Sequence, residues 1–144
     1  MCDLSKVSTE KKIKGFKIVA RKPKGRRYYS VAMGFKYPLD GHIPIVRRQH
    51  RISIRFVSDI LSKNYKLHKE NMLGRTSIFL NLEDARKEYN FHRREKMGGY
   101  ILTIVYAEIS IDVMEGYYTT ADLIFLKVIA GRHIRFIKEV TPNV

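Results

Sequence analysis

"NLEDARKEYNFHRREK", residues Asn81–Lys96, is the stretch that decides the fold class, because its pattern predicts a helix over about residues 82–95. Asn81 suits the N-cap position, and Asp84 follows three residues later in an arrangement close to a capping box. Acidic residues in the first turn and basic residues in the last turn complement the helix dipole. Leu82, Ala85 and Tyr89 form a narrow apolar stripe, so we expect one face of this helix to pack on a sheet.

The segments around this helix alternate in polarity or are continuously apolar, which is typical of strands. One segment, "ADLIFLKVIAG" (121–131), fits a strand or a helix, and "MEGYY" (114–118) is interpreted as a turn. The expected order is therefore β-β-β-β-α-β-β-β. A single helix is too few for a doubly wound sheet. We predict an α+β fold in which a curved, mainly antiparallel sheet or partly open barrel has the helix packed across it. The other expected strands cover residues 15–22, 26–33, 50–61, 75–81, 98–110 and 132–140.

The length of 144 residues fits one domain, and 44% hydrophobic residues are enough for a core. We expect residues 1–10 to form a polar N-terminal arm and residues 11–144 to form a single domain. The one cysteine, Cys2, permits no disulfide within the chain, which favours a reducing compartment. No apolar run approaches the roughly 20 residues that span a bilayer. We therefore expect a cytoplasmic protein, or one delivered into a host cytosol, that has no membrane partner.

The charge is high and unevenly distributed. The formal net charge is +14, and residues 1–72 contain 18 Lys and Arg against 5 Asp and Glu. Residues 73–144 contain 10 against 9. Such an uneven distribution of positive charge indicates a basic surface for phosphate-rich or acidic partners, although a basic surface can also serve solubility alone. We predict that the partner-binding or nucleic-acid-binding surface contains Lys11, Lys12, Lys14, Lys17, Arg21, Lys22, Lys24, Arg26, Arg27, Tyr29, Arg47, Arg48, Arg51 and Arg55.

Nine of the Lys and Arg residues lie in "KKIKGFKIVARKPKGRRYYS", residues 11–30. The alternation in its first half and the turn signal at Pro23–Gly25 predict a hairpin whose tip is strongly cationic. Tyr28 and Tyr29 are adjacent, so on a strand they point to opposite faces, and one of them is a surface candidate. Cations interleaved with aromatic residues are typical of proteins that bind single-stranded nucleic acid, although aromatic residues in strands also fill cores.

Motifs for several classes of catalysis and binding are missing from the chain. It contains no GxGxxG or GxxxxGK[ST] loop, no CxxC, no HExxH and no Gly-x-Ser-x-Gly elbow. The five histidines are not at metal-ligand spacing. We therefore expect no metal, no cofactor and no catalytic residues, and a binding protein rather than an enzyme.

One order of residues offers an enzymatic alternative. Arg21 or Arg27, the Tyr28–Ser30 turn, the "TSIF" strand and Glu139 resemble the Arg/His, Ser-Thr-Ser, Glu order of ADP-ribosyltransferases. The resemblance implies that a basic residue holds a nicotinamide dinucleotide and that the Glu orients the acceptor. The chain departs from the family because Lys138–Glu139 replaces its Glu-x-Glu or Gln-x-Glu pair.

Three longer stretches carry another resemblance: "GFKIVARKPKGRRYYSVAMGFKY" (15–37), "NMLGRTSIFLNLEDARKEY" (71–89) and "VIAGRHIRFIKEV" (128–140). Together they are similar to a group of small bacteriophage-encoded proteins. In that group, a Gly-aromatic strand leads to a Tyr-x-Ser turn, an apolar strand precedes a helix that opens with Asp-Ala, and the chain ends in a Gly-x-x-Ile strand. The resemblance implies a phage accessory protein, and inhibitors of host defence such as anti-CRISPR proteins are common in that class.

The first functional expectation is accordingly an inhibitor that binds a host nucleic-acid-handling complex, such as a CRISPR nuclease, through the basic surface. The second is a protein that binds RNA or DNA directly without sequence specificity. The third is the ADP-ribosyltransferase-like enzyme. The oligomeric state and the order of the strands stay open.

Overall fold

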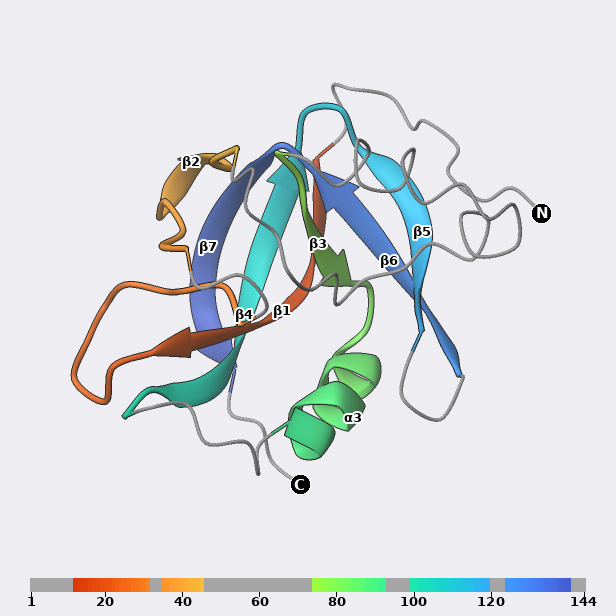
Figure 1. Cartoon of the computed structure of the whole chain (residues 1–144). Coiled ribbons are helices and arrows are strands. Elements are labelled where there is room, and N and C mark those ends of the chain that lie inside the picture. The colour runs from red at the N-terminus through yellow and green to blue at the C-terminus, as the bar shows by residue number, and fades with distance from the viewer. Residues whose placement is uncertain (1–11, 32–34, 46–73, 93–98, 120–123, 141–144) are drawn as a thin grey trace.

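The computed structural model describes residues 12–31, 35–45, 74–92, 99–119 and 124–140. These residues form one antiparallel sheet of seven strands in the order β2-β7-β4-β1-β3-β6-β5, with one helix, α3, across it. The predicted α+β class is confirmed, and Figure 1 shows the curvature of the unclosed sheet. The elements are β1 (Ile13–Arg21), β2 (Asp40–His42), β3 (Thr76–Phe79), α3 (Leu82–His92), β4 (Ile101–Ser110), β5 (Met114–Thr119), β6 (Phe125–Gly131) and β7 (His133–Val140).

Strand β4 lies between β1 and β7 and is buried from both sides, as its continuous apolar sequence predicts. It pairs with β1 along its whole length, so that Phe16 lies opposite Tyr106. Its pairing with β7 shifts register between Tyr106 and Ala107. Such a bulge bends a strand and increases its twist. The bulge therefore contributes to the curvature on this side of the sheet.

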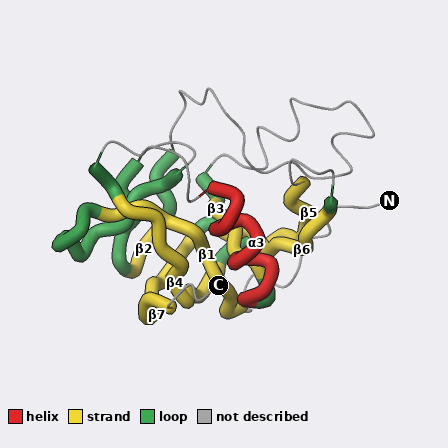
Figure 2. The backbone as a smooth tube through the Cα atoms, turned by 90° about the horizontal axis from the view of Figure 1, so that it is seen from below, coloured by secondary structure: helices red, strands yellow, loops and turns green. Residues whose placement is uncertain are grey.

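Helix α3 begins as the sequence predicts. The backbone N–H of Asp84 donates to Asn81 Oδ1 at 2.8 Å, and Asn81 Nδ2 donates to Asp84 Oδ2 at 3.1 Å. The helix packs on one side of the sheet beside β1 and β3 (Figure 2). Its stripe of Leu82, Ala85 and Tyr89 joins a core cluster there, which includes Phe79, Ile104, Leu126 and Val128.

The opposite face of the sheet has a core of its own. Val19, Ile78, Val105, Ile109, Val113, Ile129 and Ile134 are fully or almost fully buried in it. Tyr37 and Ile43, from residues 35–45, complete this second core cluster. The sheet is thus covered by apolar side chains on both faces. This arrangement determines which of the cationic side chains of β1 reach solvent.

Two predicted boundaries were wrong. Residues 114–118 are not a turn but most of β5, which pairs with β6 from Met114 to Thr119. The turn falls earlier, at Ile111 and Asp112, which both have positive φ (64° and 49°). A β-branched residue rarely takes that conformation, so its sequence does not suggest a turn there. In addition, the described part of the second expected strand, residues 26–31, is not a continuous strand: Tyr29 makes isolated bridges there, to Ala20 and to Lys36.

The remaining expected segments lie partly inside and partly outside the described residues. Residues 125–131 of the ambiguous segment are strand β6, and 76–79 and 133–140 are strands as predicted. The short strand β2 lies in a stretch for which no strand was expected. The strand expected at 50–61 lies outside the described residues, as does the polar arm, residues 1–10. Within the described ranges, no helix has the length and apolar character needed to cross a membrane.

Candidate functional site

The turn after β1 presents three of the predicted cations to solvent. The N–H of Gly25 donates to the carbonyl of Lys22 at 2.9 Å, which closes the turn. Lys22, Lys24 and Arg26 are exposed around it. Their side chains make no hydrogen bond or ion pair with the described residues. These three side chains, called the basic tip below, are exposed on and beside the turn at the end of β1.

The base of the basic tip is tied to the sheet by Arg21. Its guanidinium donates through Nε and Nη2 to the two carboxylate oxygens of Glu139 near the end of β7. Its Nη1 donates to the carbonyls of Lys22 (3.0 Å) and Pro23 (2.9 Å). The Tyr28 hydroxyl donates to Glu139 Oε1 at 3.3 Å. Arg21, Glu139 and Tyr28 therefore form a clamp, called the Arg21–Glu139 clamp below, that fixes where the basic tip projects.

The clamp also alters the acidity of Tyr28. Partial burial raises the pKa of the Tyr28 hydroxyl above its ordinary value of 10.0, and the neighbouring Glu139 carboxylate raises it further. Arg21 opposes this effect but is the smallest contribution. Tyr28 consequently stays protonated, and remains a hydrogen-bond donor to Glu139, beyond the pH at which an exposed tyrosine ionises.

Lys17 does not belong to the surface that the sequence predicted. Its side chain is buried on the face of the sheet that Tyr37 covers, and Nζ donates to the carbonyl of Ser77 at 2.8 Å. The ammonium also lies 5.6 Å from the centre of the Tyr37 ring. Alternation along β1 suggested a solvated cationic face. In the structure the residues 35–45 cover that face, so Lys17 has an internal structural role.

Other predicted site residues are dispersed. Arg27 is exposed, but its Nη2 donates to the carbonyl of Tyr37 at 2.9 Å. Tyr29 is partly buried and meets Tyr100 edge to face, with ring centres 5.4 Å apart. Lys12 and Lys14 are exposed at the start of β1, at the other end of the strand from the basic tip. Lys22, Lys24 and Arg26 are thus exposed on and beside one turn, with Arg21 and Arg27 anchoring the backbone beside them. Lys11, Arg47, Arg48, Arg51 and Arg55 lie outside the described residues.

A second site was not predicted from the sequence. An open pocket of about 510 Å³ is lined by Phe16, Tyr106, Lys138, Glu139 and Val140. Strand pairing builds it, because Phe16 lies opposite Tyr106 and Tyr106 lies opposite Lys138. The three side chains accordingly form one row on the helix-bearing face of the sheet. The aromatic residues of that row could be found from sequence only if the pairing of β1, β4 and β7 were known.

Metal binding has no evident site in the described part of the chain, where no group of three His, Cys, Asp or Glu side chains is arranged to hold an ion. The rings of His42 and His133 lie with their centres 5.3 Å apart, and His133 Nε2 lies 3.3 Å from Asp40 Oδ1. These residues join the short edge strand β2 to β7.

In comparisons with known proteins, no protein-family model, no curated protein and no solved structure matches this chain.

Proposed function

We propose that this protein is a binding protein that docks its basic tip on an anionic surface of a host nucleic-acid-handling complex and thereby inhibits it. The observation that carries the proposal is that Lys22, Lys24 and Arg26 are exposed and have no ion-pair partner among the described residues. They lie within residues 22–26, on and beside one turn. Free cations on and beside an exposed turn attract phosphate or carboxylate groups.

The clamp supports binding in a second way. Arg21 holds Glu139 and two carbonyls of the turn at once, so the backbone beneath the basic tip is fixed before a partner arrives. A preorganised loop loses less conformational freedom on binding than a flexible one. The basic tip is therefore suited to a contact of defined geometry as well as to general charge attraction.

The identity of the partner class rests on the resemblance to small phage accessory proteins. Proteins of that kind act in the host cytosol, and a CRISPR nuclease carrying its guide RNA is a representative partner. Such a complex offers both RNA phosphates and acidic protein surfaces. Both suit the chain's net charge of +14.

Capture from host lysate tests the proposal. The tagged wild type, Arg26→Glu and Lys87→Glu are compared, with mass spectrometry and nucleic-acid sequencing of what co-purifies. Lys87 is exposed on α3, so its replacement makes the same change in net charge away from the basic tip. We expect the wild type and Lys87→Glu to retain the same nucleic-acid-handling complex and Arg26→Glu to lose it. Equal retention by both variants would overturn the proposal.

Direct binding to naked RNA or DNA is the second candidate, because the same three cations would neutralise phosphates of a free strand. A mobility-shift assay separates the two candidates. Binding to naked nucleic acid that is as tight as binding to the ribonucleoprotein favours direct binding, and much tighter binding to the ribonucleoprotein favours inhibition of the complex. We do not propose ADP-ribosyl transfer, because Glu139 is engaged by Arg21 and the alternative basic residue, Arg27, donates to the carbonyl of Tyr37.

A further inference from the structure

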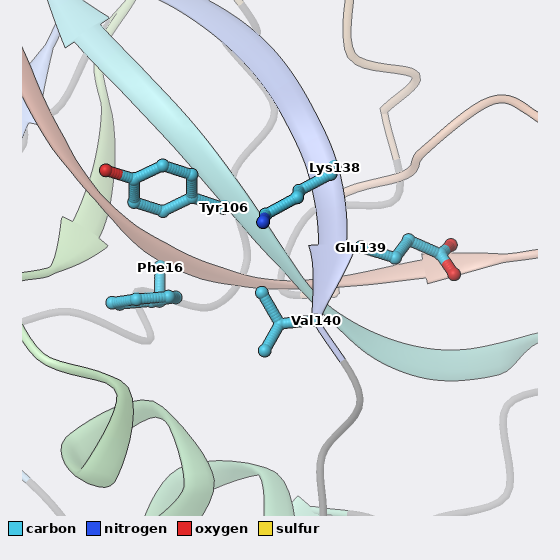
Figure 3. Close-up of a pocket in the computed structure, with 5 residues that line it drawn as sticks. All are labelled: Phe16, Tyr106, Lys138, Glu139 and Val140. Atoms are coloured by element: carbon cyan, nitrogen blue, oxygen red, sulfur yellow. The ribbon is translucent and has the colours of Figure 1, made fainter.

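The open pocket on the helix-bearing face of the sheet has a composition that the basic tip does not explain. Phe16 and Tyr106 lie side by side from β1 and β4, with ring centres 5.2 Å apart and planes tilted by 40°. Both rings are partly exposed, and Val140 continues the apolar wall. Figure 3 shows the side chains of Phe16, Tyr106, Lys138 and Val140 around one common space.

The charge of this pocket comes from Lys138. Its side chain is exposed and makes no ion pair with the described residues, and its amine points over the pocket in Figure 3. Glu139 contributes to the lining, but its carboxylate points away toward the other side of β7, where Arg21 binds it. Glu108, on the same face beside the aromatic row, is bound by Arg135 at 3.4 Å. The pocket therefore combines an aromatic wall with one available positive charge.

We infer that this pocket binds one nucleotide of a single-stranded nucleic acid, with the base against Phe16 and Tyr106 and the adjoining phosphate on Lys138. Aromatic side chains on a sheet surface bind unpaired bases by stacking, and flanking cations neutralise the backbone. The volume of about 510 Å³ is within the range of roughly 300–1,000 Å³ that is usual for ligand pockets. An aliphatic ligand would leave the lysine without a partner, and a cation would be repelled by it.

The position of the pocket relates it to the basic tip. Phe16 and Arg21 lie on the same strand, and the five intervening steps span about 17 Å. A single strand that enters the pocket can therefore continue toward the cations of the turn. The inference rests on the proposed function in one respect, namely that the partner carries nucleic acid.

Fluorescence anisotropy with labelled single-stranded oligonucleotides of mixed sequence, one RNA and one DNA, tests the inference. We expect Tyr106→Leu to weaken binding by about fivefold to a hundredfold, which is the usual effect of losing one stacked base. Tyr106→Phe keeps the ring and should keep the affinity. Lys138→Gln should weaken binding and reduce the slope of log affinity against log salt by about 0.7. Lys87→Gln, a matched loss of one exposed charge, should match the wild type.

Each result is decisive for the pocket. Binding of the RNA, the DNA or both that is weakened by Tyr106→Leu and by Lys138→Gln supports the inference. Comparison of the two oligonucleotides shows which nucleic acid the pocket binds. Failure of the wild type to bind either strand overturns the inference, as does binding that Tyr106→Leu and Lys138→Gln leave unchanged. Lys138→Gln alters an exposed side chain, so it remains informative if Tyr106→Leu does not fold. If Arg26→Glu, measured in the same series, is the one variant that reduces binding, the pocket inference fails and the basic tip remains the surface that binds.

Discussion

Arg21 at the end of β1 holds the carboxylate of Glu139 on β7, although 118 residues separate them in the sequence. The two side chains are 19% and 34% exposed, so water screens the pair only in part. The contact joins the turn that carries Lys22, Lys24 and Arg26 to the far side of β4. The stability of the sheet and the position of the basic tip are therefore linked at one ion pair.

Breaking that pair by Glu139→Gln should lower the free energy of unfolding by about 1 kcal/mol, because one charged partner of a partly exposed, bidentate pair is removed. The expected fall in Tm is about 2–4 °C. Thermal unfolding followed by circular dichroism measures it. Glu115→Gln is the matched control, since Glu115 pairs with Lys127 at 3.8 Å between two exposed side chains. An equal effect in both variants would show that the Arg21–Glu139 clamp has no special role.

Alkaline pH should destabilise the protein through Tyr28. The folded-state pKa of Tyr28 lies above its ordinary value of 10.0, so its contribution to stability is complete below that pH. As the pH rises from 10.0 through the folded-state pKa, the unfolded state releases the proton first, and the free energy of unfolding falls. Chemical denaturation at a series of pH values measures this loss.

The Tyr28 titration itself is observed as the difference in tyrosinate absorbance between the wild type and Tyr28→Phe. Glu139→Gln should shift the Tyr28 pKa down toward its ordinary value, because both the nearby charge and the hydrogen bond to it raise that pKa. A Tyr28 pKa that does not respond to Glu139→Gln would exclude the contact. Tyr28→Phe should also reduce the additional loss of stability above pH 10.0.

Gly15 should not tolerate a side chain. A Cβ there would lie 2.3 Å from the backbone oxygen of Phe79 and 2.9 Å from Ile78 Cδ1, where β1 pairs with β3. We expect Gly15→Ala to cost about 1–3 kcal/mol, because backbone atoms must separate to admit the methyl group. Gly25→Ala is the control, as its nearest neighbour is Lys22 Cβ at 3.1 Å in a surface turn. Urea denaturation of both variants gives the comparison, and a neutral Gly15→Ala would contradict the close approach of β1 and β3.

Asn81 should contribute to stability as the N-cap of α3. Its Oδ1 accepts the hydrogen bond of the Asp84 N–H, so Asn81→Ala leaves that donor without its partner. The expected loss is about 1 kcal/mol, while Asn81→Ser keeps an acceptor and most of the stability. Denaturation followed at the helical circular dichroism band tests both variants. Equal stability of Ala and Ser at this position would mean that the cap contributes nothing.

The helix and the central strand could be predicted because their signals are local. Asn81 and Asp84 are three residues apart, and the sequence of β4 is largely apolar on both faces. The burial of Lys17 could not be predicted in this way, since it depends on Tyr37 covering that face of the sheet. Strand β5 was missed because Gly116 suggests a turn, whereas the actual turn uses positive φ at Ile111 and Asp112.

The candidate sites show the same division between local and distant signals. Lys22, Lys24 and Arg26 are visible as a cationic turn in the sequence, and the structure keeps them exposed. The Arg21–Glu139 clamp and the pairing of Phe16, Tyr106 and Lys138 depend on strand neighbours that are far apart along the chain. Sequence patterns therefore indicated the charge of the basic tip but neither its anchor nor the pocket.

The central claim is that the basic tip makes the decisive electrostatic contact with the partner. Its most direct test is the dissociation constant of the captured host complex, measured at a series of salt concentrations for the wild type, Arg26→Glu and Lys87→Glu. The account predicts that wild-type binding weakens steeply with salt, that Lys87→Glu follows it, and that Arg26→Glu abolishes binding. Wild-type binding that is insensitive to salt, or Arg26→Glu binding as tightly as Lys87→Glu, would contradict it.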